Sequence, residues 1–250
     1  YYMENYNIDP TISYDVVELP SKGIFYSNNK KSLRVAYLTA SDENILVAPN
    51  LLQSDTVIEE LLKRKILDKD FNIDELVDED RQAILIFLRN TAFGSEYEME
   101  MIDSKTNLPF KFTLDLSILK VKDFNLKPDE NGEYSYFMKS SKKNVTFKYL
   151  NNVQEKDLIK IRDNSPTAVA PVTTKRLEMM IKSVQGNKDQ MNIRNFIENL
   201  PIKDSQDFQK FVRDNKPGLD LVQTTTTPSG DTIQVNIGFG VEFFRPFYGI

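Results

Sequence analysis

The pattern of hydrophobic and polar positions changes period along the chain, and each period predicts a kind of element. Between about 54 and 67, apolar residues recur every three to four positions, with Ile58 and Leu62 on one face. Between about 78 and 93, acidic residues come first, an apolar run follows, and Gly94 stands where a helix can end. The second of these predicted helices is apolar nearly all round, so we expect it to be buried.

Two other stretches alternate apolar and polar residues at every second position, which predicts strands with one wet face. The first stretch runs from 96 to 116 and turns near 103–108. The second runs from 219 to 239 and turns at 228–231, which reads Pro-Ser-Gly-Asp. The order of helix, glycine and hairpin therefore occurs twice, although no sequence identity between the two copies supports a repeat.

The other segments divide into a β-rich part and a helical part. Residues 1–52 are irregular with short strands, of which 33–38 is the best, and residues 120–150 form a further β-rich stretch. Four candidate helices follow, at 154–163, 172–185, 190–199 and 205–215. Proline and glycine separate these four segments, as is typical of helix boundaries.

The whole pattern predicts an α+β fold, in which helical segments are interleaved with antiparallel β-hairpins and no parallel nucleotide-binding sheet is present. We expect two parts. Residues 1–150 hold the helix pair and β-hairpins, and residues 151–250 hold a helical part that ends in a β-hairpin and an aromatic C-terminal tail. The pattern leaves open whether these two parts pack separately or as one body.

Composition restricts the chemistry more than it restricts the fold. The 250 residues include no cysteine and no histidine. Disulfides, thiolate nucleophiles, thiolate zinc sites and imidazole bases are therefore excluded within this sequence. The sequence also lacks a phosphate-binding glycine loop. We expect no enzyme activity, no catalytic residue and no cofactor, and we expect turn residues to hold the hairpin tips.

Charge and hydropathy also limit the classes of partner that this protein is expected to bind. The net charge is −5, which makes nucleic acid a poor partner because phosphate binding favours a basic surface. The longest clear apolar run, Ala83 to Leu88, is far shorter than the ~20 residues that span a bilayer, so we expect no membrane segment. A solvated turn explains one small basic cluster, and contact with an acidic partner is the alternative reading. The cluster consists of Lys139, Lys142, Lys143 and Lys148.

One acidic loop has the spacing of a calcium-binding loop between two predicted helices. Its oxygen-bearing residues are Asp68, Asp70, Asn72, Asp74 and Glu79. The sixth position of such a loop needs a glycine, and Ile73 stands there instead; a β-branched residue resists the positive φ of that turn. We therefore favour a solvated loop that caps the next helix, and a calcium module remains the minor alternative.

The last fourteen residues, 237–250, carry an unusual density of aromatic side chains. Chain ends are usually polar unless something holds them, so these rings must lie in the protein's own core or against a partner. We predict a docking role for residues of this tail and of a compact proline turn near the N-terminus. The predicted partner-binding residues are Phe243, Phe244, Arg245, Phe247, Tyr248, Leu19 and Pro20. If the tail only docks, deletion of 241–250 leaves the fold intact.

Three segments carry a resemblance to a known family. They are the turn 18–23 (Glu-Leu-Pro-Ser-Lys-Gly) with the following stretch 34–43, the helix pair that runs into the hairpin 96–116, and 237–246 (Ile-Gly-Phe-Gly-Val-Glu-Phe-Phe-Arg-Pro). Taken together, they resemble the baseplate hub subunit and hub-assembly family of T-even-like contractile-tailed bacteriophages. The segment 144–217 is less specific.

This resemblance implies a non-enzymatic component of a contractile tail baseplate, in its central hub, that acts by protein–protein binding during hub and tail assembly. The implied partners are other hub proteins and the tape-measure protein. The implied location is the virion tail baseplate, after assembly in the host cytoplasm. A transient tail-assembly chaperone that is absent from the finished virion is the alternative, and the sequence does not separate the two.

Overall fold

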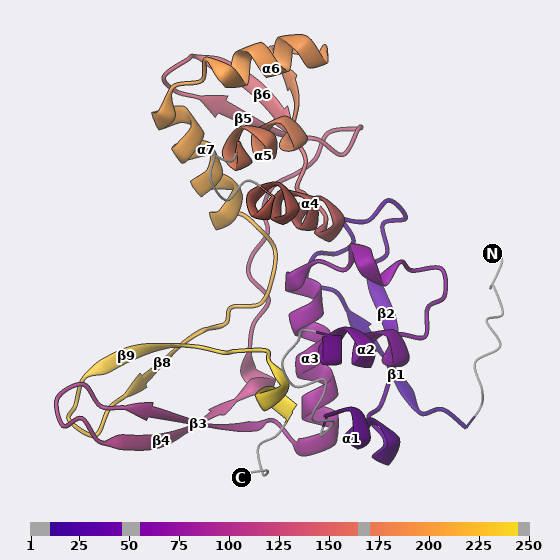
Figure 1. The fold of residues 1–250 in the computed structure, drawn as a ribbon, viewed down its shortest axis with the longest axis vertical. Coiled ribbons are helices and arrows are strands. Elements are labelled where there is room, and N and C mark those ends of the chain that lie inside the picture. Colours follow the sequence, from indigo (N-terminus) through magenta and orange to yellow (C-terminus); the bar gives the residue numbers. More distant parts are fainter. Residues whose placement is uncertain (1–10, 47–55, 165–170, 245–250) are drawn as a thin grey trace.

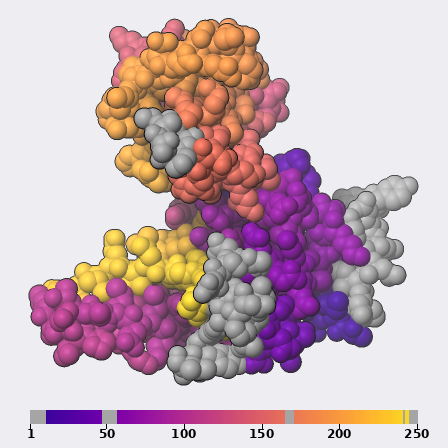
Figure 2. Space-filling model, in the orientation of Figure 1, coloured from indigo at the N-terminus to yellow at the C-terminus, as the bar shows by residue number. Residues whose placement is uncertain are grey.

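The computed structural model describes residues 11–46, 56–164 and 171–244. It has three parts, which we call the lower body, the upper body and the arm (Figure 1). The lower body holds the N-terminal strands and helices, the upper body holds a small sheet with its helices, and the arm holds two hairpins. Figure 2 shows the arm as a projection from the lower body, with the upper body joined above.

The lower body is built around the predicted buried helix. Its elements are β1 (Tyr14–Glu18), β2 (Ser32–Ala36), α1 (Ala40–Leu46), α2 (Thr56–Lys65), the short 3-10 helix η2 (Ile73–Glu75) and α3 (Asp78–Phe93). β1 and β2 pair antiparallel, with Val16 opposite Arg34. Ile84, Leu85 and Leu88 of α3 are fully buried, which confirms that this helix lies in the core. Gly94 ends α3 with a φ of 84°, as predicted.

The upper body is a three-stranded antiparallel sheet with helices packed on it. Its elements are β5 (Tyr134–Met138), β6 (Lys143–Phe147), α4 (Asn152–Asp163), α5 (Val172–Met180), β7 (Ile181–Val184), α6 (Gln190–Glu198) and α7 (Ile202–Asp214). The strand order is β5-β6-β7, so strands from both sides of residue 150 share one sheet. Phe147 and Phe208 are fully buried, and their rings meet edge to face at 5.2 Å. This contact joins the sheet to α7.

The prediction of one helix over 172–185 was wrong at its C-terminal end. Helix α5 stops at Met180, and the next four residues form β7. β7 pairs with the free edge of β6, with Val145 opposite Val184 and Thr146 opposite Ser183. The ladder and the burial of Ile181 outweigh the local helical preference of this short segment, because β-branched residues fit a buried strand well.

Both predicted hairpins are present and form the arm. The first consists of β3 (Glu96–Ile102) and β4 (Pro109–Asp115), and the second of β8 (Val222–Thr226) and β9 (Thr232–Asn236). Exposed and half-buried residues alternate strictly along β3 and β4, which confirms one wet face. Two short 3-10 helices, η3 (Leu116–Ile118) and η4 (Val241–Phe244), follow the hairpins.

The two hairpins lie side by side although more than 100 residues separate them in the sequence (Figure 1). At their base, the Lys122 amide donates to the Gly218 carbonyl and the Asp220 amide donates to the Lys120 carbonyl, both at 2.8 Å. At their tips, side chains join the two turns, as described below.

The observed fold is α+β, as predicted. Among the described residues, every strand pairing is antiparallel. In the same part of the chain, no helix has both the length and the apolar character needed to cross a bilayer.

Candidate functional site

The C-terminal aromatic residues that the structure describes lie in the protein's own core. The side chains of Phe243 and Phe244 are 0% and 1% exposed. The Phe243 ring lies 5.2 Å from the Tyr97 ring and 5.0 Å from the Phe239 ring. η4 therefore closes over the point where the arm leaves α3.

Arg89 of α3 fills the centre of this aromatic cluster. Its side chain is 1% exposed and donates to the carbonyls of Gly94 at 2.8 Å and Glu96 at 3.1 Å. The guanidinium carbon lies 4.9 Å from the Tyr97 ring centre and 5.6 Å from that of Phe243. Burial lowers the pKa of Arg89, and the ring faces partly compensate its charge. Arg89 thus fixes the direction in which β3, the first strand of the arm, leaves the end of α3.

The burial of Phe243 and Phe244 bears on the prediction that the aromatic tail docks on a partner. Phe243 and Phe244 present no surface to a partner in this conformation, and deletion of 241–250 would remove part of the core. The remaining predicted tail residues, Arg245, Phe247 and Tyr248, lie outside the described residues.

The predicted proline turn near the N-terminus is also part of the core. Leu19 is 2% exposed, and Pro20 and Ser21 are buried. The carboxylate of Asp80, at the start of α3, accepts hydrogen bonds from the Ser21 amide (2.9 Å), the Ser21 hydroxyl (2.5 Å) and the Tyr26 hydroxyl (2.6 Å). Burial raises the pKa of Asp80 even though these hydrogen bonds oppose the shift. The turn is therefore an anchor for α3.

Gly23 makes this turn possible. Its φ is +82°, and a Cβ atom there would lie 2.6 Å from the backbone of Asn29. Only glycine tolerates both the backbone conformation and the close approach. The turn residues that carry the family resemblance are thus required by packing.

The structure does not bring the five oxygen-bearing residues of the acidic loop together. Asp68 binds Lys30 and Arg34, each at 3.0 Å, and Asp70 binds Lys30 at 3.0 Å. Burial alone would raise the pKa of Asp68, but the hydrogen bonds from Arg34 and Lys30 lower it.

The other members of the loop have partners elsewhere. The side chain of Asn72 accepts from the Asp74 amide and caps η2, and Glu79 pairs with Lys216 at 2.6 Å. Over the described ranges, no group of three or more acidic residues is placed to hold a metal ion.

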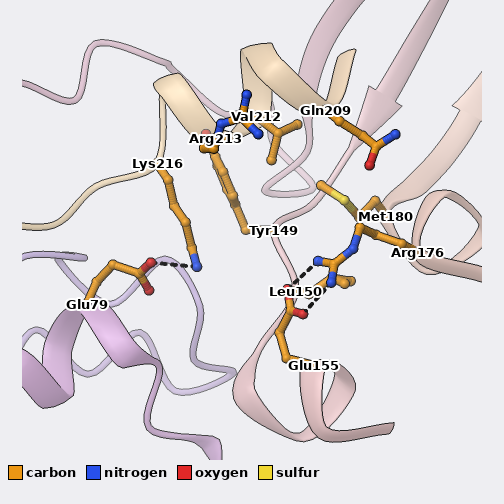
Figure 3. Close-up of a pocket in the computed structure, with 10 residues that line it drawn as sticks. All are labelled: Glu79, Tyr149, Leu150, Glu155, Arg176, Met180, Gln209, Val212, Arg213 and Lys216. Carbon is orange, nitrogen blue, oxygen red and sulfur yellow. Dashed lines mark hydrogen bonds and ion pairs between the residues drawn. The ribbon is translucent and has the colours of Figure 1, made fainter. Parts of the chain in front are cut away.

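A pocket of about 360 Å³ lies where the upper body meets α3 (Figure 3). Its apolar lining consists of Tyr149, Leu150, Met180 and Val212. Two ion pairs flank it: Lys216 with Glu79 at 2.6 Å, and Arg176 with both carboxylate oxygens of Glu155 at 2.6 and 2.8 Å. Because the chain's own cations pair with both carboxylates, we interpret this pocket as a joint between the two bodies, although Oε2 of Glu79 has no hydrogen-bond partner among the described residues.

Turn residues join the two tips of the arm, as expected for a chain without metal knuckles. Asp103, at the end of β3, accepts from the Ser229 amide at 3.0 Å and from the Ser229 hydroxyl at 2.8 Å. Lys105 pairs with Asp231 across the same gap at 2.6 Å. Asp103 is 1% exposed and also accepts from the Lys105 amide at 2.9 Å. We call these four residues the tip latch.

Replacement of Asp103 by alanine is expected to open the tip latch. The change leaves the Ser229 amide without its partner, so we expect a loss of about 1–3 kcal/mol in the free energy of unfolding. Hydrogen exchange should show faster exchange at the Ser229 amide. Lys105→Ala, which removes only an exposed ion pair, should cost about 0–1 kcal/mol. An unchanged Ser229 exchange rate in the Asp103 variant would contradict the latch.

The arm also exposes large apolar side chains. Ile102 and Leu108, at the tip of the first hairpin, are each 64% exposed. Met99, Met101, Phe110 and Phe112, on the opposite face of the same hairpin from Ile102, are half-buried. The sequence predicts the hairpins correctly but does not show this surface, because Ile102 is an apolar residue on the face that the alternation assigns to solvent.

Comparison with known proteins identifies one family. A family model described as T4 bacteriophage base plate protein matches residues 11–244 of the chain. No curated protein and no solved structure matches it.

Proposed function

The chain belongs to the T4 bacteriophage base plate protein family, and on this basis we propose that it is a non-enzymatic subunit of the central hub of a contractile tail baseplate. Membership makes it a structural component of the phage tail. Its mechanism would be protein–protein binding to other hub proteins, with the tape-measure protein as a further candidate partner. Assembly would take place in the host cytoplasm.

The observation that carries the proposal is the arm. It projects from the lower body (Figure 2). Ile102 and Leu108 are exposed at its tip, and methionine and phenylalanine side chains on the opposite face of the first hairpin from Ile102 are half-buried. Protein interfaces are enriched in aromatic residues and methionine. The tip latch and Arg89 restrain both ends of the arm, so little conformational entropy would be lost when it docks.

The charged groups support a non-enzymatic role, because the buried carboxylates are occupied by structural hydrogen bonds. Asp80 anchors the N-terminal turn, and Asp103 joins the arm tips. Asp204 accepts from the Ser140 and Ser141 amides at 2.8 and 2.7 Å and holds the β5–β6 turn on α7. None of these groups is free to act as an acid or base.

Paired substitution of the arm tip tests the proposal. Ile102→Asp with Leu108→Asp is expected to abolish incorporation into hub complexes in infected cells, because charge at the centre of an apolar interface is strongly unfavourable. Both residues are exposed, so the free energy of unfolding should change by less than about 1 kcal/mol. The matched control is Thr113→Asp with Thr224→Asp, on exposed positions of the two hairpins. Normal incorporation of the tip variant would rule out docking through the arm.

Two further measurements refine the role. Mass spectrometry of purified virions separates a permanent hub subunit, which is present, from a transient assembly chaperone, which is absent. Truncation after Phe244 keeps both buried rings and removes Arg245, Phe247 and Tyr248. If this truncation blocks assembly without changing stability, the end of the tail is a second docking element; if assembly is normal, it is not.

A further inference from the structure

A second pocket, of about 300 Å³, lies between the upper body and the loop that joins β1 to β2. Lys148, just after β6, and Lys182, on β7, both line it. The Lys148 amide donates to the Met180 carbonyl at 3.0 Å, beside the start of β7, and the charge of Lys148 acts on Lys182. Lys148 belongs to the basic cluster noted in the sequence; the structure leaves Lys139, Lys142 and Lys143 around the β5–β6 turn, outside this pocket.

Within the described part of the chain, neither lysine forms an ion pair, and only Glu133 acts on Lys182 as an opposite charge from a longer distance. Lys182 donates to the Met179 carbonyl at 2.7 Å, and neither ammonium group has a carboxylate within 4.0 Å there. Burial, and then the charge of Lys148, lower the pKa of Lys182. The nearest carboxylates are engaged elsewhere: Glu133 pairs with Lys188 at 3.0 Å, and Glu75 accepts from Asn72 at 3.3 Å.

The rest of the lining adds the start of a helix, apolar surface and one carboxylate, that of Glu75. Asn151 and Gln154 form the capping box of α4, so the positive end of that helix faces the pocket. The remaining walls come largely from apolar and aromatic side chains. These are Ile24, Phe25, Tyr26, Tyr134, Tyr149 and Met179.

We propose that this pocket binds an acidic peptide segment of a protein partner, with a carboxylate placed between Lys148 and Lys182. A half-buried ammonium group without an ion-pair partner is unfavourable, and an incoming carboxylate removes that cost. The aromatic walls fit the methylene stem of the acidic side chain and an apolar neighbour. No residue of the arm lines this pocket, so this contact goes beyond docking through the arm.

The test uses the isolated full-length protein and a short blocked peptide, Leu-Glu-Glu-Leu, with Leu-Gln-Gln-Leu as the neutral control. Amine acetylation followed by mass spectrometry measures the labelling rate of Lys182. The acidic peptide at millimolar concentration is expected to slow that rate several-fold, and the neutral peptide is expected to leave it unchanged. Inorganic phosphate is tested in parallel. Protection by phosphate without protection by the acidic peptide would overturn the proposal in favour of a free-anion site.

Removal of the two lysine charges provides a second test. Lys148→Gln with Lys182→Gln is expected to weaken binding of the acidic peptide at least about tenfold in titration calorimetry. Lys139→Gln with Lys143→Gln removes the same charge from exposed positions of the same sheet and should change binding less than about twofold. Equal losses in both variants would show non-specific attraction and refute the site. Because no other phage protein is present, a failure here is distinct from a failure of arm docking.

Discussion

Replacement of Phe243 by alanine is expected to lower the free energy of unfolding by about 3–5 kcal/mol. The ring is 0% exposed and touches Tyr97, Phe239 and Phe244, with ring centres 5.0 to 5.4 Å away. Its loss would leave a cavity and would uncover one face of the buried Arg89 guanidinium, whose centre lies 5.6 Å from the ring. Urea denaturation of the purified variant measures the effect.

A surface phenylalanine supplies the control for this experiment. Phe137 on β5 is 50% exposed, and its replacement by alanine should cost less than about 1 kcal/mol. If the two variants were equally stable, Phe243 would not be a core residue in solution. In that case the reading of the aromatic tail as a docking element would return.

The second large effect is expected at Asp80. Replacement by alanine removes the acceptor of three hydrogen bonds and leaves the Ser21 amide and the Tyr26 hydroxyl buried without it. At about 1–3 kcal/mol for each of these two unsatisfied donors, the free energy of unfolding should fall by about 2–6 kcal/mol. Tyr26→Phe removes one donor together with its bond and should cost less. The double variant should be less destabilised than the sum of the two singles, because one donor is then absent.

Asp80 also makes the free energy of unfolding depend on pH, and the direction of that dependence follows from its pKa shift. Burial raises its pKa in the folded protein, so the folded state binds more protons than the unfolded state between the two pKa values. The contribution of Asp80 to the free energy of unfolding is therefore fully present at a pH below its pKa in the unfolded chain. It is lost as the pH rises through its pKa in the folded protein. Relative to Asp80→Asn, the wild-type chain should gain stability as pH falls through this window. Denaturation curves of both proteins at several pH values measure that difference, and a difference that does not change with pH would contradict the shift.

Elements with strong local signals were predicted correctly. Helix α3 has an apolar run and a terminal glycine, and the hairpins have alternating residues on both sides of a turn. Strand β7 was predicted as helix, because four residues carry too little periodicity to separate the two states. Residues 181–184 form a strand because the free edge of β6 offers backbone hydrogen-bond partners to them. Helix α1 was missed for the same reason, since its seven residues make a weak pattern.

The site was less predictable than the fold. The sequence indicates that Phe243 must be covered by something, but the covering ring of Tyr97 lies far away in the chain. Likewise, Asp103 and Ser229 are ordinary turn residues by their local sequence. Only the approach of the two hairpins makes them partners.

The sequence by itself determined the α+β class, most helices, both hairpins and the family, because these depend on local periodicity, turn chemistry and short motifs. The tertiary structure decided which apolar residues are covered, which hairpins pair, and which charges lack a partner. Those outcomes depend on contacts between distant segments, whose free energy no local pattern encodes. Phe243 and Phe244 are core residues for that reason, and the exposed tip of the arm is the docking surface that we propose.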